Sequence, residues 1–108
     1  MISRLRGQLA GRTPDGGVVV DVGGVGYLVA ATPSVLRGAE HGGEVVVETY
    51  LHVREDALQL YGFADAAERE LFVQLLSVSG IGPKVALAIV SGSDGTSGAG
   101  KRNVRGPA

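Results

Sequence analysis

The residues best suited to bind a charged ligand lie in the segment 79–84, Ser-Gly-Ile-Gly-Pro-Lys. Gly80 and Gly82 let the backbone turn sharply and approach a phosphate without an intervening Cβ. Pro83 suits the first position of a following helix, whose free N–H groups and dipole attract an anion. Lys84 adds a formal positive charge. The spacing predicts a helix-hairpin-helix motif, in which Ile81 fills the gap between the helices. The residues predicted to form its phosphate site are Ser79, Gly80, Ile81, Gly82 and Lys84.

A helix hairpin with a glycine turn and no ligand is the simpler interpretation of the same segment. Dinucleotide binding is disfavoured, because Val85 stands where the motif G-x-G-x-x-G requires its last glycine and no strand precedes the turn. The apolar Leu75 and Leu76 before the turn favour the phosphate-binding hairpin, as do the small residues Ala86 and Ala88, which would allow close helix packing.

Two helices must position this turn. Asp65 is placed to cap the first helix, and Glu68, three residues later, completes a carboxylate version of the capping box. Apolar residues then recur at helical spacing. They are Leu71, Phe72, Leu75 and Leu76. Since the second helix opens at Pro83, residues 64–92 are predicted to form one helix-hairpin-helix unit.

The adjacent carboxylates Glu55 and Asp56 are a second candidate site. From the residues alone they are best interpreted as the polar tip of a hairpin, where charged residues are expected. A catalytic pair is disfavoured because neighbouring residues on a strand point in different directions, and no histidine or nucleophile accompanies them.

Residues 1–63 show β-type patterning throughout. Strands are expected at 2–7, 18–22, 26–30, 44–53 and 58–63, with tight turns at 14–17 and 23–24 and a helical turn at 32–36. Five short strands in so few residues predict a small barrel, and glycines at the corners favour an OB-like Greek key. An SH3-like barrel has the same strand count, so the pattern leaves both open.

Composition limits the class of protein. The chain of 108 residues is 44% hydrophobic and 19% charged, as is typical of a globular protein. No apolar run approaches the roughly 20 residues of a membrane helix, and no signal peptide is evident, so we expect a cytoplasmic protein that does not contact membranes. The absence of cysteine and the isolated His41 and His52 predict neither a metal site nor a cofactor.

The formal net charge is −1, which is unlike a free-standing nucleic-acid binder. Residues 1–63 carry five basic against seven acidic side chains, and residues 64–92 carry two against three. Nucleic-acid affinity must therefore come from local amides and a few cations, and from repetition of the unit.

Residues 93–108 are rich in glycine and serine and are expected to form a disordered tail. The segment 95–101 fits G-x-x-x-x-G-K, but Arg102 stands where a P-loop requires Ser or Thr. Gly106 and Pro107 oppose the helix that should follow. We therefore expect no ATPase activity.

Several motifs together resemble the RuvA family, the Holliday-junction-binding subunits of the bacterial branch-migration complex. The match is colinear from Met1 to about Gly92. The motifs are 1–7 (MISRLRG), 22–27 (VGGVGY), 53–57 (VREDA) with 60–63 (LYGF), 68–72 (ERELF) and 80–84 (GIGPK). The resemblance implies an OB barrel, a domain with two helix-hairpin-helix motifs, and a further helical domain that contacts the RuvB motor.

The resemblance also implies a function. Members bind four-way junction DNA as homotetramers and act with the RuvB ATPase and the RuvC resolvase in DNA recombination, repair and the SOS response. They are DNA-binding subunits and not enzymes. In the family, the residues corresponding to Glu55 and Asp56 form an acidic pin at the centre of the tetramer, where they hold the junction open by repulsion.

The resemblance ends near Gly92, so we expect a truncated form that lacks the second hairpin and does not contact RuvB. Two other interpretations stay open: an inert fragment, or a generic single-strand nucleic-acid-binding OB module. The second is disfavoured because only five aromatic residues are present and the core needs several of them. A base-excision enzyme is disfavoured because it would need a catalytic pocket that this small barrel hardly provides.

Overall fold

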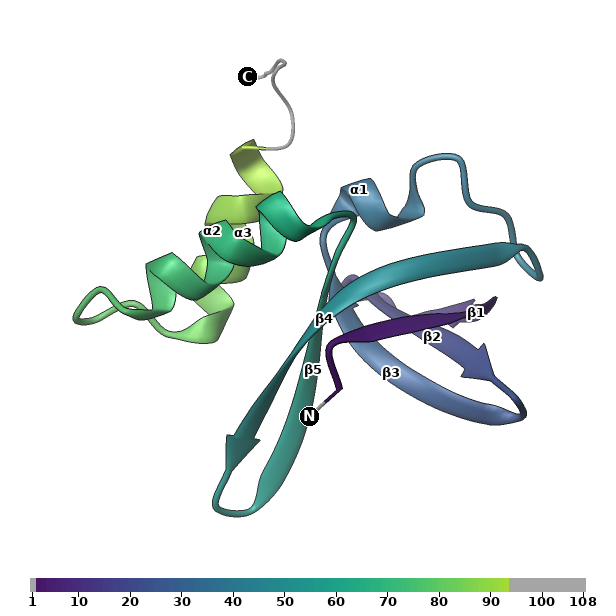
Figure 1. Ribbon diagram of the computed structural model, residues 1–108, viewed down its shortest axis with the longest axis horizontal. Helices are drawn as coiled ribbons and strands as arrows, with labels where there is room; N and C mark the ends of the chain where they lie inside the picture. The colour runs from purple at the N-terminus through teal and green to yellow at the C-terminus, as the bar shows by residue number, and fades with distance from the viewer. Residues whose placement is uncertain (1, 94–108) are drawn as a thin grey trace. The chain divides into compact units, whose positions relative to one another are not determined.

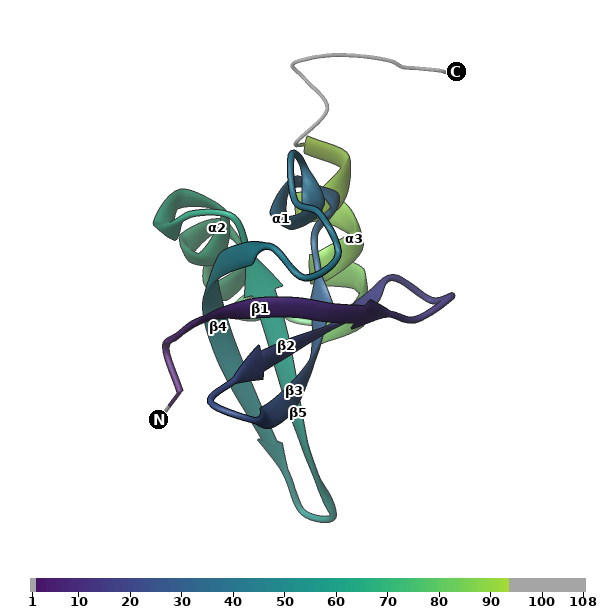
Figure 2. The ribbon, with the colours of Figure 1, turned by 90° about the vertical axis from the view of Figure 1, so that its right-hand side faces the viewer.

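The computed structural model describes residues 2–93, and its five strands form a closed barrel (Figures 1 and 2). The strands are β1 (Arg4–Arg12), β2 (Gly17–Val22), β3 (Val25–Ala31), β4 (Glu44–Arg54) and β5 (Ala57–Phe63). The helices are α1 (Pro33–Leu36), α2 (Ala66–Leu76) and α3 (Pro83–Ser93). The chain divides into two compact units, one up to Arg69 and one from Glu70 onward. Residues 94–108, with most of the expected tail and the P-loop-like segment, lie outside the described residues.

The strand order around the barrel is β1-β2-β3-β5-β4, and β4 pairs with β1 to close it. All neighbours are antiparallel except β3 and β5, which run parallel at Val29↔Leu60, Ala30↔Tyr61 and Ala31↔Gly62. This order, with α1 between β3 and β4, is the OB-type Greek key. The sequence pattern was compatible with either an OB-like or an SH3-like barrel. The parallel pairing of β3 with β5 identifies the barrel as OB-like.

The barrel interior is filled by aliphatic residues that alternate along the strands, as a period of two requires. Val18 and Val20 on β2, Val29 on β3 and Val47 on β4 have no exposed surface. The remaining core members are Leu5, Leu9, Val35, Val45 and Leu60. Cross-strand pairs also stabilise the outer surface: Arg4 and Glu48 face each other on β1 and β4 and form a salt bridge of 2.7 Å.

Strand β1 extends further than the sequence predicted. The expected strand covered 2–7, whereas β1 runs from Arg4 to Arg12 with a register shift between Leu9 and Gly11. Gly7, which weakens a strand by itself, is needed there because a Cβ would lie 2.2 Å from the backbone oxygen of Asp21 on β2. The other four strands match their predicted ranges to within one residue at each end.

Within 2–93, no helix is both long and apolar enough to cross a membrane.

Gly62 on β5 lies close to side chains of both β3 and β4. A Cβ at this position would lie 2.6 Å from one methyl carbon of Val29 on β3 and 2.6 Å from one of Val47 on β4. Both valines are fully buried, so neither side chain has free space to move into. A glycine is therefore required for the barrel to close.

We expect Gly62→Ala to lower the free energy of unfolding by ~1–3 kcal/mol, because it overpacks the core. The matched control is Gly11→Ala, whose Cβ would meet its nearest atom, a methyl of Val19, at 4.0 Å. This control should be neutral or slightly stabilising. Urea denaturation followed by circular dichroism measures both, and equal stability of the two variants would contradict the closure argument.

Candidate nucleic-acid interface

The turn between α2 and α3 has the backbone geometry that the sequence predicted. The N–H of Ile81 donates to the carbonyl oxygen of Val78 at 3.2 Å, which closes a four-residue turn. Gly80, at the third position of this turn, has a φ of 87°. A positive φ there is typical of a type II turn, and an L side chain would be strained. Glycine at position 80 is thus required by the backbone itself.

The start of α3 presents unpaired backbone donors. Gly82 is its N-cap, since its carbonyl oxygen accepts the N–H of Ala86 at 3.0 Å. The N–H groups of Lys84 and Val85 belong to the first turn and have no intrahelical acceptor. Gly82 and Lys84 are exposed, and a Cβ on Gly82 would meet nothing within 4 Å. An anion has space to reach these donors.

The other predicted residues of this turn have distinct places. Ser79 and Gly80 are exposed, and Ile81 is half-buried. Of the two small residues on α3, Ala86 is fully buried, but Ala88 is exposed and does not contribute to helix packing. Residues two apart lie on different faces of a helix, so the expectation that both alanines would allow close packing is wrong for Ala88.

The acidic pair forms the tip of the β4–β5 hairpin. Arg54 pairs with Ala57 across the strands, so Glu55 and Asp56 are the two connecting residues. Both are exposed, and Figures 1 and 2 show the hairpin extending away from the other strands. Both carboxylates are therefore accessible to a ligand. The tip belongs to the first unit and the turn 79–84 to the second, so each is a separate candidate site.

Near the hairpin, burial raises the pKa of the Tyr61 phenol above its usual value of 10.0, and the Arg54 charge partly offsets the effect. The phenol therefore stays protonated at neutral pH and acts as a core residue of β5.

Among residues 2–93, no group of three His, Cys, Asp or Glu side chains lies close enough to hold a metal ion.

A cluster that the sequence did not reveal joins the start of α2 to the barrel. The Glu68 carboxylate accepts the Thr32 hydroxyl at 2.8 Å and the Ser34 hydroxyl at 2.6 Å. It also accepts the N–H of Ala64 at 3.0 Å. The predicted Asp65 cap is present, because the N–H of Glu68 donates to Asp65 Oδ1 at 2.9 Å. The second half of the predicted capping box differs, since the Glu68 carboxylate accepts the N–H of Ala64 and not that of Asp65. We call Thr32, Ser34, Ala64 and Glu68 the Glu68 cluster.

Arg69, the next residue, makes a second connection to the same unit. Its guanidinium Nε donates to the backbone oxygen of Thr49 on β4 at 2.7 Å. The hydroxyl of Thr49, which is fully buried, donates to the backbone oxygen of Ile2 at 2.8 Å. The first turn of α2 is thus part of the barrel unit. Its partners are 20 to 36 residues away in sequence, so no local pattern could identify them.

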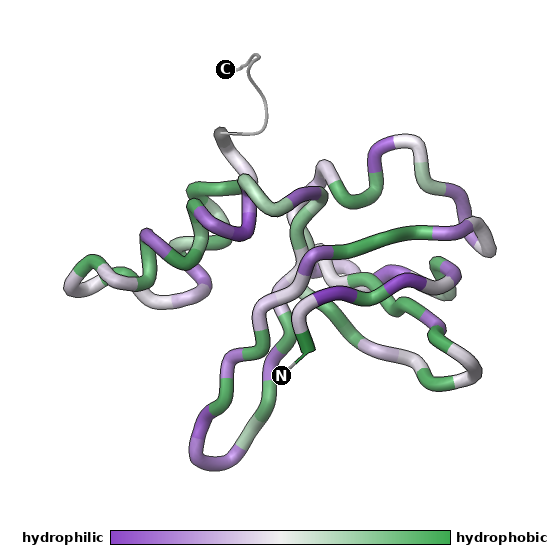
Figure 3. Tube along the Cα trace, viewed as in Figure 1, coloured by the Kyte–Doolittle hydropathy of each residue, from purple (hydrophilic) through white to green (hydrophobic). Residues whose placement is uncertain are grey.

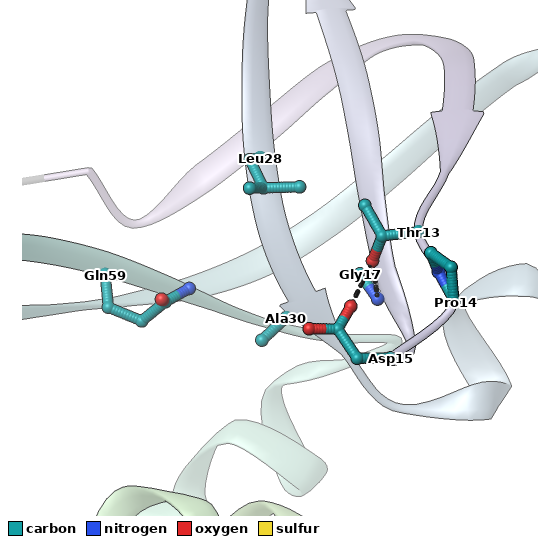
Figure 4. A pocket seen from close by; sticks show the side chains of 7 residues that line it. All are labelled: Thr13, Pro14, Asp15, Gly17, Leu28, Ala30 and Gln59. Atoms are coloured by element: carbon teal, nitrogen blue, oxygen red, sulfur yellow. Dashed lines mark hydrogen bonds between the residues drawn. The ribbon is translucent and has the colours of Figure 1, made fainter.

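The outer surface of the barrel carries an open hollow of about 480 Å³ (Figure 4). It lies between the β1–β2 loop, β3 and β5. Its lining residues are Thr13, Pro14, Asp15, Gly17, Leu28, Ala30 and Gln59. The Thr13 hydroxyl donates to Asp15 Oδ1 and accepts the N–H of Gly17 at 2.8 Å. None of the seven lining residues is basic or aromatic, so the hollow does not favour phosphates or stacked bases.

The chain is similar to known proteins over most of its length. Residues 1–62 match the family described as RuvA N terminal domain. A protein from Rubrobacter xylanophilus is 56% identical over 92 residues, which is 84% of this chain and 46% of that protein. Proteins from Chlorobium phaeobacteroides and Pseudomonas syringae are 50% and 52% identical over 93 residues, 85% of this chain and 46% of each. All three are named Holliday junction branch migration complex subunit RuvA. The chain spans about half the length of these relatives.

We expect Glu68→Ala to lower the free energy of unfolding by ~2 kcal/mol, because it removes hydrogen bonds to a charged acceptor and leaves the buried Thr32 hydroxyl with fewer partners. The control is Glu70→Ala on the same helix, since Glu70 is exposed. Its effect should stay within about 0.5 kcal/mol. Thermal and urea unfolding measure both variants, and similar losses would mean that the cluster does not stabilise the unit.

Proposed function

The chain belongs to the RuvA family, and on this premise we propose that it binds four-way DNA junctions as a non-catalytic module in recombination and repair. The family supplies the class of DNA, since its curated members carry the Holliday junction in their names. The chain covers about half the length of these relatives, so junction binding by this part of the protein belongs to the proposal. Such a protein would work on chromosomal DNA in the cytoplasm.

The observation that carries this proposal is the start of α3. The N–H groups of Lys84 and Val85 lack intrahelical partners, the space at Gly82 is open, and the Lys84 side chain is exposed. A DNA phosphate would accept these N–H bonds and lie at the positive end of the helix dipole. Lys84 would add charge attraction. The turn formed by Ser79, Gly80 and Ile81 would let the DNA backbone approach.

Glu55 and Asp56 would repel the same DNA that the start of α3 attracts. Carboxylates repel phosphates, so a projecting acidic tip cannot add affinity for a continuous duplex. At a junction, the strands diverge and leave a central space where no phosphate need contact the tip. We propose that the two residues form an acidic pin there, which favours an open junction over a duplex.

Several copies would be needed for strong binding. The formal net charge is −1, and one phosphate site per chain supplies little affinity. A homotetramer would repeat the site and gain avidity, and it would gather the acidic tips around one axis. We propose this assembly, with the barrel 1–63 supplying the pin and the helix hairpin 64–92 supplying the phosphate contact. The family suggests the RuvC resolvase as a further partner, whereas the resemblance assigns the contact with the RuvB motor to a helical domain other than the barrel and the first hairpin.

Gly82→Asp should weaken junction binding at least about fivefold, because like charges about 4 Å apart repel by ~1–4 kcal/mol. The control is Gly82→Ala, which adds a Cβ in open space without a charge and should have a much smaller effect. Lys84→Ala should weaken binding mildly and reduce the slope of log affinity against log salt by ~0.7–0.9. Fluorescence anisotropy with a synthetic junction measures all three. Unchanged affinity in a folded Gly82→Asp variant would exclude this phosphate site.

Replacing both tip residues, Glu55→Lys with Asp56→Lys, should raise affinity for duplex DNA and lower the preference for a junction, because repulsion becomes attraction. The matched control is Glu40→Lys with Glu44→Lys, the same charge change at two exposed positions elsewhere on the barrel unit. Competition between junction and duplex gives the selectivity. A pin role requires the tip variant to lose more selectivity than the control, and a uniform loss of affinity for every DNA would indicate a structural role instead.

A further inference from the structure

The β4–β5 hairpin extends beyond the strands that flank it. Strand β1 pairs with β4 only as far as Glu48, and β3 pairs with β5 only from Leu60 onward. Between these points, the described strand pairings of residues 51–59 are those of β4 with β5. We call this segment the ribbon. It projects from the barrel in both views (Figures 1 and 2).

One face of the ribbon continues the face that lines the barrel core. Leu51 pairs with Leu60, and Val53 pairs with Leu58, two residues further along each strand. Residues two apart on a strand share a face, so all four side chains belong to one face. Leu60 is a core residue at 8% exposure, whereas Val53 is 66% and Leu58 69% exposed. The apolar face thus runs out of the core and ends uncovered beside the tip.

Mutual contact across the ribbon does not account for this arrangement. A cross-strand pair of aliphatic residues stabilises a hairpin, but here both side chains keep most of their surface in water. Figure 3 shows hydrophobic positions on both arms directly above the hydrophilic tip. Apolar surface gathered on a projecting element is typical of a contact site.

The charge of the tip selects the chemistry of the partner. Glu55 and Asp56 adjoin the apolar pair through single residues, Arg54 on one arm and Ala57 on the other. A sugar-phosphate backbone would be repelled at this distance. The flat face of a nucleobase is uncharged and apolar, and aliphatic side chains do pack between base steps in DNA complexes. Base pairs that flank a branch point have such faces available, because stacking is interrupted there.

We propose that Val53 and Leu58 pack against nucleobases beside the branch point of a four-way junction, with the acidic tip in the central space. This inference rests on the proposed function and adds a specific contact to it. The carboxylates keep phosphates away, and the apolar pair contributes the favourable contact that repulsion alone cannot supply. Separated bases would be stabilised at the centre of the junction.

The test uses the full chain and a synthetic four-way junction with 2-aminopurine, which fluoresces more strongly when unstacked, at the branch point. The wild-type protein should raise this fluorescence, and Val53→Thr with Leu58→Gln should abolish most of the rise. Junction affinity should fall about tenfold, since burying one such side chain is worth ~1.5–3 kcal/mol. Affinity for duplex DNA should not change. Leu58→Gln alone, at a position that is already exposed, should show the same effect more weakly and guards against misfolding of the double variant.

The matched control is Leu28→Gln, because Leu28 is 56% exposed on β3, outside the ribbon. It should behave as the wild type. If the wild type binds the junction selectively but the ribbon variants retain its fluorescence rise and affinity, the inference alone is overturned. If the wild type shows no preference for the junction, the proposed function fails with it. If the ribbon variants change the molar mass in light scattering, Val53 and Leu58 contact a second copy of the chain, which also overturns the inference.

Discussion

The parallel pairing of β3 with β5 is the constraint on which the rest of the first unit depends. It has three residue pairs and is the only parallel contact among the described strands. Without Gly62 the strands could not approach closely enough to form it. The N–H of Thr32 then donates to the Gly62 oxygen at 3.1 Å, which directs the chain from β3 into α1. Barrel closure thereby brings the Thr32 and Ser34 hydroxyls to the carboxylate of Glu68.

The two candidate sites are built by different means. The phosphate site is a property of local backbone: a positive φ at Gly80, an N-cap at Gly82 and the first turn of α3 create it. The acidic tip depends on tertiary structure, because β1 pairs with the first half of β4 and the second half projects with β5. A variant that destabilises the barrel should therefore affect the tip more directly than the turn.

The structural features that depend on neighbouring residues could be predicted from the sequence. The turn at 79–82, the helix start at Pro83, the cap at Asp65 and four of the strands follow from residue types a few positions apart. Contacts between distant residues could not be predicted. The two hydroxyl partners of the Glu68 carboxylate are 34 and 36 residues away, and the strand pairing that closes the OB barrel is also between distant residues. The exposure of Val53 and Leu58 could not be predicted either, because the alternation of apolar residues around them is typical of a strand with one buried face.

The length of the ribbon has a consequence for how this protein family can vary. Side chains alternate between the two faces of a strand, so one extra residue in each arm between the core and the tip would turn the apolar pair to the opposite face. Two extra residues in each arm would restore it and move the acidic tip outward by roughly 7 Å, at about 3.4 Å per residue. Insertions or deletions in this hairpin should accordingly be tolerated in even steps per arm and rejected in odd ones. Only hairpins whose arms differ in length from those of this chain by an even number of residues keep the apolar pair on the same face.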